Sequence, residues 1–295
     1  MSSLLDAESR ELEQTAGSRA LARRGAASSA PTGRSAPAPR AAKPADAIVR
    51  VEDLSVGYDD TVLLEHVSFT VERGEVFMIV GSSGCGKSTL LKHVIGLTPP
   101  LAGRVLIDGD DIGKAEGAAR QAILKRIGVM YQSGALFGSR TLRENVRLAL
   151  EEFTPLDDDQ MDLVARLKLH LVGLDHLCGH LPSEVSGGEQ KRAAIARAMA
   201  LDPAILFLDE PGAGLDPVTS AQLDALVLRL KQSLRVTFVI VTHELASIYA
   251  AADRVIMLDR SARGIVAEGS PQALRDASDD PLVRHFFRRE AAASR

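Results

Sequence analysis

Gly81-Ser82-Ser83-Gly84-Cys85-Gly86-Lys87-Ser88-Thr89 is the stretch that decides the fold of this chain. It satisfies the pattern G-x-x-x-x-G-K-[ST] and directly follows the apolar run Val76–Val80. The residues after it place apolar side chains on one helical face: Leu90, Leu91, Val94 and Ile95. A strand, a glycine-rich loop and a helix in this order are typical of a phosphate-binding loop, because backbone N–H groups and the positive end of the helix dipole surround the phosphate. An ordinary glycine-rich turn is the alternative, but a chance match in such a chain is on the order of one in a hundred.

Chemistry gives individual residues of this loop their predicted roles. Lys87 is expected to reach the β- and γ-phosphates of a bound nucleotide. Ser88 is expected to offer its hydroxyl oxygen to Mg²⁺, a hard cation that prefers oxygen ligands. Thr89 and the residues from Gly81 to Gly86 complete the predicted nucleotide cradle, in which Cys85 acts as a small filler. ATP and Mg²⁺ are therefore the predicted ligands.

A pair of carboxylates ends a second apolar run. Asp209 and Glu210 directly follow Ile205-Leu206-Phe207-Leu208. Paired acids at the end of a strand are often solvated loop residues. Beside a phosphate loop, however, Mg²⁺ needs a carboxylate and hydrolysis needs a base for water. We therefore predict that Asp209 binds the metal and that Glu210 is the base.

Two further polar residues stand at the ends of apolar runs. Gln132 follows Ile127–Tyr131, and His243 follows Val236–Thr242. If these runs are parallel strands, their ends meet at the carboxyl edge of one sheet, where open α/β folds bind ligands. His243 is therefore a predicted γ-phosphate contact, and Gln132 a predicted sensor of Mg²⁺ and of the attacking water.

The remaining pattern indicates an α/β fold with two additions. Ile48–Ser55 and Val62–Val71 alternate apolar and polar residues around a turn at Gly57, Asp59 and Asp60, as half-buried antiparallel strands do. Short, nearly continuous apolar runs predict strands of a parallel sheet: Val76–Val80, Ile127–Tyr131, Ala204–Leu208, Thr237–Val241 and Val255–Leu258. Residues 134–201 lack a strand candidate and predict a helical insert.

Composition excludes several classes of protein. The 295 residues are 45% hydrophobic with a net charge of -4 and no long basic block in the folded part, so nucleic acid is not an expected partner. Cys85 and Cys178 are too far apart in sequence for a C-x-x-C unit. No uncharged apolar stretch approaches the roughly 20 residues of a membrane helix. If the protein acts at a membrane, another chain must anchor it.

The first 46 residues predict a disordered tail. They are rich in Ala, Ser, Pro, Gly and Arg and contain few large apolar residues, too few to offset the entropy of ordering. Their basic side chains could touch anionic lipid headgroups, although a solvated tail without a role is the favoured interpretation. A cleaved targeting peptide is disfavoured because the tail has no apolar core and carries several acids.

A second glycine motif precedes an alanine-rich helix that Asp202 and Pro203 end. The motif is Val185-Ser186-Gly187-Gly188-Glu189-Gln190-Lys191-Arg192, called the signature segment below. Taken alone, Ser186 followed three residues later by Glu189 is an ordinary capping box. Placed between the phosphate loop and the Asp209-Glu210 pair, the segment resembles the signature motif that distinguishes ABC ATPases from other P-loop proteins.

The other motifs of ABC ATPases occur in the family's order. Tyr58 stands where the family places an aromatic residue that stacks on adenine. Gly214-Leu215-Asp216 resembles the loop that communicates across the dimer, and Gln132 and His243 match the family's Q and H positions. The resemblance covers about Ile48 to Arg288. It implies a P-loop NTPase fold with a mostly parallel RecA-like sheet, an N-terminal antiparallel β subdomain and an α-helical subdomain.

The resemblance also implies a shared nucleotide site. In ABC ATPases the signature serine and glycines, here Ser186, Gly187 and Gly188, bind the γ-phosphate of ATP held by the opposite subunit. Two copies would then close around two ATP molecules as a homodimer, with Glu189 and Asp216 also near the nucleotide. Glu189 replaces the commoner Gln, and Val185 the usual Leu; neither change is expected to disable the site.

Within the family, the chain most resembles the ATPases that serve mammalian-cell-entry proteins in bacterial phospholipid transport, the lipid-asymmetry type. Three segments carry this resemblance: Tyr131-Gln-Ser-Gly-Ala-Leu-Phe137, Leu181-Pro-Ser-Glu-Val-Ser-Gly187 and Asp280-Pro-Leu-Val-Arg-His-Phe-Phe287. Members of that group often have Met at the position of Glu189. The implied partners are an integral membrane permease and a mammalian-cell-entry protein, and the implied location is peripheral, at the cytoplasmic face of the bacterial inner membrane.

Composition and the resemblance together divide the chain into a tail (1–46), an ABC ATPase domain (47–279) and a C-terminal segment (280–295) that is a possible dimer contact. The helical insert and the segment from Gln132 to Asn145 would pass motion to the permease, with Ala135, Leu136 and Phe137 as the contact surface. In the C-terminal segment, apolar residues recur at helical spacing and could dock on the partner subunit or pack on their own domain: Leu282, Val283, Phe286 and Phe287.

Three alternative functions stay open at this point. The chain could be the ATPase of another ABC importer. A soluble ABC ATPase, such as an iron-sulfur assembly type, would share every motif and lack a permease. A P-loop kinase would need a site for a phosphate acceptor and would not need Ser186-Gly187-Gly188. Neither the transported substrate nor the direction of transport follows from an ATPase subunit that does not touch the substrate.

Overall fold

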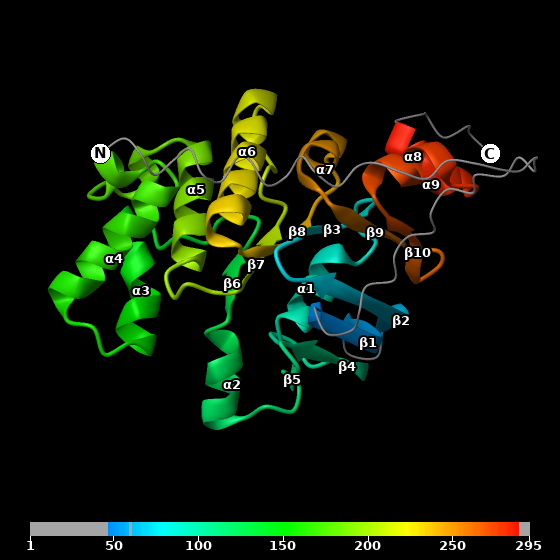
Figure 1. The fold of residues 1–295 in the computed structure, drawn as a ribbon, viewed down its shortest axis with the longest axis horizontal. Coiled ribbons are helices and arrows are strands. Elements are labelled where there is room, and N and C mark those ends of the chain that lie inside the picture. Colours follow the sequence, from blue (N-terminus) through cyan, green and yellow to red (C-terminus); the bar gives the residue numbers. More distant parts are fainter. Residues whose placement is uncertain (1–46, 59–60, 289–295) are drawn as a thin grey trace, which may run out of the picture. The chain divides into compact units, whose positions relative to one another are not determined.

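The short apolar runs form a six-stranded sheet in the order β10-β9-β3-β8-β7-β6 (Figure 1). The computed structural model describes residues 47–58 and 61–288. Five strands of this sheet are mutually parallel: β3 (Val76–Gly81), β6 (Ile127–Met130), β7 (Ile205–Asp209), β8 (Thr237–Val241) and β9 (Arg254–Asp259). Continuous apolar runs suit strands that are covered on both faces. The prediction of a mostly parallel sheet is confirmed.

An antiparallel sheet built from the N-terminal hairpin accompanies the parallel one. β1 (Ala47–Tyr58) pairs with β2 (Thr61–Glu72), as predicted from their alternating pattern. Asp59 and Asp60 of the predicted turn, like the predicted tail of residues 1–46, lie outside the described residues. The sheet order is β2-β1-β4-β5.

Three strands were not predicted from the sequence: β4 (Ala102–Ile107), β5 (Asp110–Asp111) and β10 (Gly264–Gly269). The first half of β4 is exposed, β5 has two acidic residues, and β10 is only partly buried between two glycines. None of them has a long apolar run or a clear alternation. Their pairing partners, rather than their own side chains, fix them as strands.

Alternate residues of β3 belong to two hydrophobic cores. Phe77 and Ile79 pack in a core with α1 (Lys87–Val94) and the N-terminal sheet. Val76 and Met78 pack in a second core that the helices on the other face of the parallel sheet share. Because side chains alternate across a strand, one strand serves both cores. In Figure 1, α1 lies between the two sheets.

Helices fill the chain between β6 and β7, in residues that the structure describes throughout. They are α3 (Leu142–Phe153), α4 (Asp158–Leu171) and α5 (Gly187–Ala198), with short 3₁₀ turns at Asp175–Leu177 and Pro182–Glu184. α3, α4 and α5 each begin with a capping box, which satisfies N–H groups that the first turn of a helix leaves unpaired. We call this group of helices the helical subdomain.

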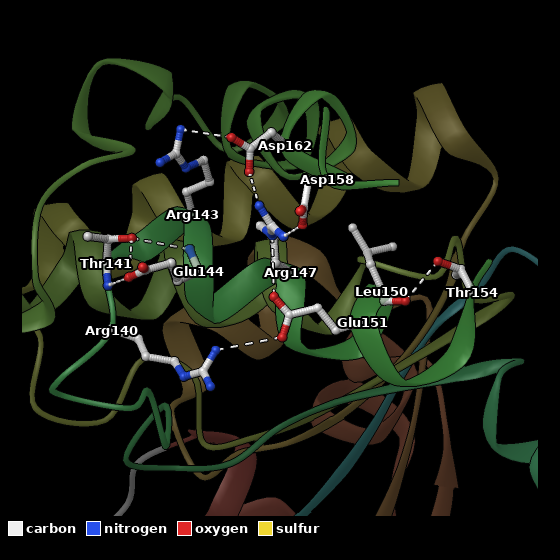
Figure 2. Close-up of polar contacts among 10 residues, drawn as sticks. All are labelled: Arg140, Thr141, Arg143, Glu144, Arg147, Leu150, Glu151, Thr154, Asp158 and Asp162. Atoms are coloured by element: carbon white, nitrogen blue, oxygen red, sulfur yellow. Dashed lines mark hydrogen bonds and ion pairs between the residues drawn. The ribbon is translucent and has the colours of Figure 1, made fainter. Parts of the chain in front are cut away.

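Arg147 of α3 ties the helical subdomain together (Figure 2). Its guanidinium lies 2.6 Å from Asp162 and 2.5 Å from Asp158, both on α4, and 3.3 Å from Glu151 of its own helix. The Arg147 side chain is 17% exposed and that of Asp162 32%, so this pair is screened less by solvent than the pair with Asp158, which is 85% exposed. The network favours movement of α3 and α4 as one unit.

The remaining helices cover the sheets or follow the last strand: α2 (Gly117–Leu124), α6 (Pro217–Leu234), α7 (Leu245–Ala251), α8 (Pro271–Ala277) and α9 (Pro281–Arg288). In α9, Val283 and Phe287 are buried in their own domain, and the Tyr249 hydroxyl donates to the Phe287 carbonyl at 2.7 Å. Leu282 is 43% exposed. A dimer contact through the C-terminal segment therefore stays a prediction, and residues 289–295 lie outside the described part.

None of the helices in the described part of the chain combines the length and the apolar character needed to cross a membrane.

Candidate nucleotide-binding site

The phosphate loop makes a turn whose first residue has to be glycine. Gly81 has a φ of 146°, and a Cβ atom at this position would lie 2.4 Å from the Leu258 carbonyl oxygen and 2.8 Å from Cys85 Sγ. The loop therefore packs directly on β9. Cys85 itself is 3% exposed, and burial raises the pKa of its thiol, which suits a packing residue. Gly86, with a φ of 102°, is the N-cap of α1.

Lys87 places a buried ammonium inside the loop. Its Nζ atom donates to the carbonyl oxygens of Gly81, at 3.0 Å, and Ser82, at 2.9 Å. Only 5% of Lys87 is exposed. The loop thus combines a fixed positive charge with the N-terminus of α1, and both favour an anion such as phosphate.

Ser88 and Asp209 bring two oxygen ligands together from different elements. The Ser88 hydroxyl donates to Asp209 Oδ1 at 2.9 Å, although the residues are far apart in sequence. Asp209 is 7% exposed, and burial raises the pKa of its carboxyl, which the hydrogen bond from Ser88 partly opposes. The pair presents a carboxylate and a hydroxyl beside the phosphate loop.

Glu210 lies between the two polar residues predicted at neighbouring strand ends. His243 Nδ1 is 3.1 Å from Glu210 Oε1, and Gln132 Nε2 is 3.5 Å from Glu210 Oε2. The Glu210 backbone has a φ of 45°, in the left-handed region that residues other than glycine rarely adopt, and its N–H donates to the Val241 carbonyl of β8. The turn aims the carboxylate toward both neighbours.

One cavity of about 330 Å³ joins these strand ends to the phosphate loop. Its lining contains six residues of the phosphate loop, Leu63 of β2 and three polar side chains from other strand ends: Ser83, Gly84, Gly86, Lys87, Ser88, Thr89, Leu63, Gln132, Glu210 and His243. The expected convergence at the carboxyl edge of the sheet is thus present in the structure.

The signature segment lies at a different cleft of the same chain. Ser186, Gly188 and Glu189 line a hollow of about 100 Å³ together with Leu215 and Thr219. Ser186 is the N-cap of α5, and its hydroxyl donates to Glu189 Oε2 at 2.7 Å. Hydrogen bonds from Ser186 lower the pKa of the Glu189 carboxyl. Within one chain, the signature segment is therefore not part of the phosphate-loop cavity.

Comparison with known proteins decides what kind of site this is. The sequence model of the family described as ABC transporter matches residues 64–213. The chain belongs to this family. It is 38% identical over 241 residues to the intermembrane phospholipid transport system ATP-binding protein MlaF of Escherichia coli K12, an alignment that covers 81% of this chain and 88% of MlaF.

Two further relatives extend the comparison. The probable ribonucleotide transport ATP-binding protein mkl of Mycobacterium tuberculosis H37Rv is 38% identical over 239 residues, which cover 81% of this chain and 66% of mkl. Among solved structures, the dimeric post-hydrolysis state of the ATP-binding cassette MJ0796 with ADP and Pi matches with a TM-score of 0.68 at 29% identity, over 75% of this chain and 98% of that one.

Membership of the ABC transporter family settles the enzyme class. The chain is an ATP-binding ABC ATPase, a hydrolase of ATP, and the alternative of a P-loop kinase is wrong. The predicted fold class agrees with the fold of its structural neighbours.

Tyr58 stands close to the phosphate loop of this ABC ATPase but outside its cavity. The residue ends β1, is 47% exposed, and its hydroxyl lies 2.9 Å from Thr89 Oγ1. An exposed ring beside the phosphate loop is available for stacking on a base. Adenine stacking by Tyr58 stays a prediction.

Asp216 serves this ABC ATPase as a helix cap. Its carboxylate accepts hydrogen bonds from the backbone N–H groups of Val218 and Thr219 at the start of α6, each at 3.0 Å. Hydrogen bonding with Thr219 lowers the pKa of Asp216. A Cβ atom on Gly188 would lie 2.5 Å from Thr219 Cγ2, so the signature segment and the Asp216 turn are in contact. A role of Asp216 in nucleotide binding stays a prediction.

The sequence did not single out Lys191, although the structure connects it to the site of this ABC ATPase. Lys191 is 8% exposed on α5, and its Nζ atom donates to the carbonyl oxygen of Gln132. One feature of the sequence could have indicated a buried role for Lys191. It precedes a run of mostly alanine and isoleucine residues in α5, and such a run is expected to be buried.

We predict that Asp209→Asn stabilises the protein in the absence of nucleotide and metal. Because burial raises the folded-state pKa of Asp209, the folded state binds its proton more tightly, and the stability contributed by this group is lost as pH rises through the raised pKa. Asparagine keeps an acceptor for Ser88 without the charge. Thermal unfolding at pH 7 should show a gain of about 1 kcal/mol, or roughly 2–4 °C.

The gain should shrink as pH falls toward 3.8, the ordinary pKa of an aspartate. Asp216→Asn is the control, because the pKa of Asp216 is lowered and its neutralisation should give no gain at pH 7. An Asp209→Asn protein that melts below wild type at pH 7 would contradict the prediction.

Proposed function

We propose that this ABC ATPase powers phospholipid transport through a separate membrane permease, together with a mammalian-cell-entry protein. The observation that carries the mechanism is the separation, within one chain, of the phosphate-loop cavity from the signature segment. The 38% identity with MlaF supports phospholipid as the cargo. The chain would lie at the cytoplasmic face of the bacterial inner membrane, held there by the permease.

The side chains around the phosphate-loop cavity suit distinct steps of hydrolysis. Glu210, with its carboxylate facing the cavity, would take the proton of the attacking water. Gln132 would orient that water and sense the metal. Lys87 and His243 would stabilise the charge that develops on the transferred phosphoryl group. The contacts of Glu210 with Gln132 and His243 support this division, because all three can act on one water molecule.

The oxygen ligands beside the phosphate loop suit Mg²⁺. Proteins usually hold this cation with one or two side-chain oxygens while substrate phosphates and water complete its shell. Ser88 and Asp209 provide a hydroxyl and a carboxylate 2.9 Å apart, and Gln132 would add an amide oxygen. When bound, Mg²⁺ neutralises charge on the phosphate oxygens.

The signature segment would complete the nucleotide site of a second copy. Ser186, Gly187 and Gly188 form the N-terminus of α5, where unpaired N–H groups and the positive end of the helix favour the γ-phosphate. Two copies would close head to tail around two ATP molecules, and loss of the γ-phosphate would reopen them. The dimeric MJ0796 cassette in a post-hydrolysis state supports such a homodimer.

The surface that would meet the permease follows Gln132. Phe137 is 56% exposed, which is unusual for a large aromatic residue, and Ala135 has a left-handed φ of 49° that helps to turn the chain outward there. Leu136 is partly buried between them. An exposed aromatic residue suits contact with another protein when its backbone is fixed, as that of Phe137 is by Asn145.

We expect Glu210→Gln to bind ATP yet turn it over about a hundredfold or more slowly, because a positioned base typically contributes that much. Lys87→Ala should instead lose nucleotide affinity, since it removes the buried ammonium of the phosphate loop. Steady-state hydrolysis and equilibrium binding of a fluorescent ATP analogue measure the two effects. Near-normal turnover by Glu210→Gln would remove Glu210 from the base role.

Mixing two inactive variants tests the shared site. In a dimer of Lys87→Ala with Ser186→Arg, one site combines both defects and the other combines an intact phosphate loop with an intact signature segment. Each variant alone should be inactive, and their mixture should recover ATP hydrolysis. If each nucleotide site were formed by one chain alone, the mixture would be as inactive as each variant by itself.

Purification from the native host tests the proposed cargo and partners against the alternative functions. The tagged chain should bring down an integral membrane permease and a mammalian-cell-entry protein, and the reconstituted complex should move labelled phospholipid between vesicles in an ATP-dependent way. Transport of labelled ribonucleotide would favour a function like that named for mkl. Purification with soluble iron-sulfur assembly proteins would favour the assembly-type alternative.

A further inference from the structure

Two cations of α5 hold the backbone of the segment that carries Gln132. Lys191 Nζ donates to the Gln132 carbonyl oxygen. Arg197 donates to the carbonyl oxygens of Gly134, at 2.8 Å, and Ala135, at 2.6 Å. Backbone groups in an irregular segment need such partners when water does not reach them. Three of four successive carbonyls, from Gln132 to Ala135, are thus bound by side chains of one helix.

Packing brings the same segment against α5. Gly134 is buried with a φ of 74°, and a Cβ atom there would lie 3.5 Å from the Cβ of Ala194 and 3.9 Å from the Gln190 carbonyl oxygen. Both neighbours belong to α5, as do Lys191 and Arg197. The segment therefore lies directly on the helix that begins at Ser186.

The far end of the loop is fixed to α3 in the same way. Asn145 is fully buried, and its amide nitrogen donates to the carbonyl oxygens of Phe137, Arg140 and Thr141 at 3.0 to 3.1 Å. Its amide oxygen accepts from the Phe137 N–H at 2.8 Å. We call residues 132–141 the Gln132 loop. Both of its ends are held by helices of the helical subdomain.

The contact between the Gln132 side chain and Glu210, at the end of β7, is weaker than the contacts that bind the Gln132 loop to α5 and α3. Gln132 Nε2 lies 3.5 Å from Glu210 Oε2, the outer limit of a hydrogen bond. Glu210, in turn, is bound into the sheet through its N–H and the Val241 carbonyl of β8. The Gln132 backbone thus belongs to the helical subdomain, and the Glu210 backbone belongs to the sheet.

Burial and nearby acids act on the charge of Lys191 in opposite directions, and burial has the larger effect. Burial lowers the pKa of Lys191, and the negative charges of Glu210, Asp209 and Glu244 act in the opposite direction. Burial also lowers the pKa of Arg197, which Tyr131 partly opposes. Two of the three acids that oppose the effect of burial on Lys191, Glu210 and Asp209, are residues of the candidate site.

We propose that Lys191 and Arg197 are positioning residues for ATP hydrolysis, which fix the Gln132 backbone to the helix that starts at Ser186. Movement of Ser186 toward a nucleotide on the partner copy would then carry Gln132 with it relative to Glu210. This inference rests on the proposed function, because it assigns Gln132 and Ser186 their roles there. It adds a mechanical link between the two half-sites of one chain.

A double-mutant cycle separates positioning from simple structural support. The purified full-length variants are Lys191→Met, Gln132→Ala and the double variant, with kcat and KM for ATP measured for each. Lys191→Met should lower kcat about tenfold and leave KM within about twofold of wild type. If Lys191 acts through Gln132, adding Lys191→Met to Gln132→Ala should lower kcat no further. Effects that multiply, or an unchanged kcat in Lys191→Met, would overturn the proposal.

Two further variants control for the loss of a buried cation. Lys168, which is 3% exposed on α4 of the same subdomain, pairs with Asp202 and does not touch the Gln132 loop. Lys168→Met should lower the melting temperature and leave kcat near wild type. Lys191→Arg should restore most of kcat, because arginine can still donate to the Gln132 carbonyl; failure of this rescue would count against the proposal.

Arg197→Lys takes the place of Lys191→Met in the cycle if the latter does not fold. This variant leaves one ammonium to bind the two carbonyl oxygens of Gly134 and Ala135. Adding it to Gln132→Ala should likewise lower kcat no further. A wild-type protein without ATPase activity would overturn the proposed function itself. An active wild type with additive variants would overturn only the positioning role.

Discussion

Four parallel strands that end at one edge of a sheet are the constraint on which the rest of this structure depends. β3, β8, β7 and β6 are neighbours in that order, and the residues that follow them are the phosphate loop, His243, Glu210 and Gln132. Parallel pairing sends every carboxyl end to the same side. Polar groups separated by more than a hundred residues therefore meet around one cavity without a dedicated binding domain.

In the proposed function, separation of the two glycine motifs makes the chain dependent on a second copy. The phosphate loop belongs to the sheet, whereas the signature segment begins α5 in the helical subdomain. The ion pairs of Arg147 and the hydrogen bonds of Asn145 hold that subdomain and the Gln132 loop together. In the proposed mechanism, a change at the signature segment would reach Glu210 and Gln132 through these packed helices, since such elements move as units.

Much of the fold, and the meeting of several polar side chains at one edge of the sheet, could be predicted from the sequence because buried parallel strands and phosphate loops have strong local patterns. β8 was predicted to the residue, and the positions of Asp209, Glu210, Gln132 and His243 at the ends of strands were predicted from the apolar runs before them. Their roles in hydrolysis stay predictions. β4 and β10 were missed because pairing, rather than their own side chains, makes them strands. Lys191 and Arg197 were missed because their partners are backbone carbonyls, which leave no pattern in a sequence.

With Glu210 in its proposed role as the base, its left-handed backbone sets stability against turnover at a single residue. A φ of 45° costs a residue with a side chain on the order of 1–3 kcal/mol, which the pairing of β7 with β8 has to offset. Glycine would relax the turn but would leave it without a carboxylate. In that role, selection for heat resistance and selection for fast hydrolysis would pull in opposite directions at this position.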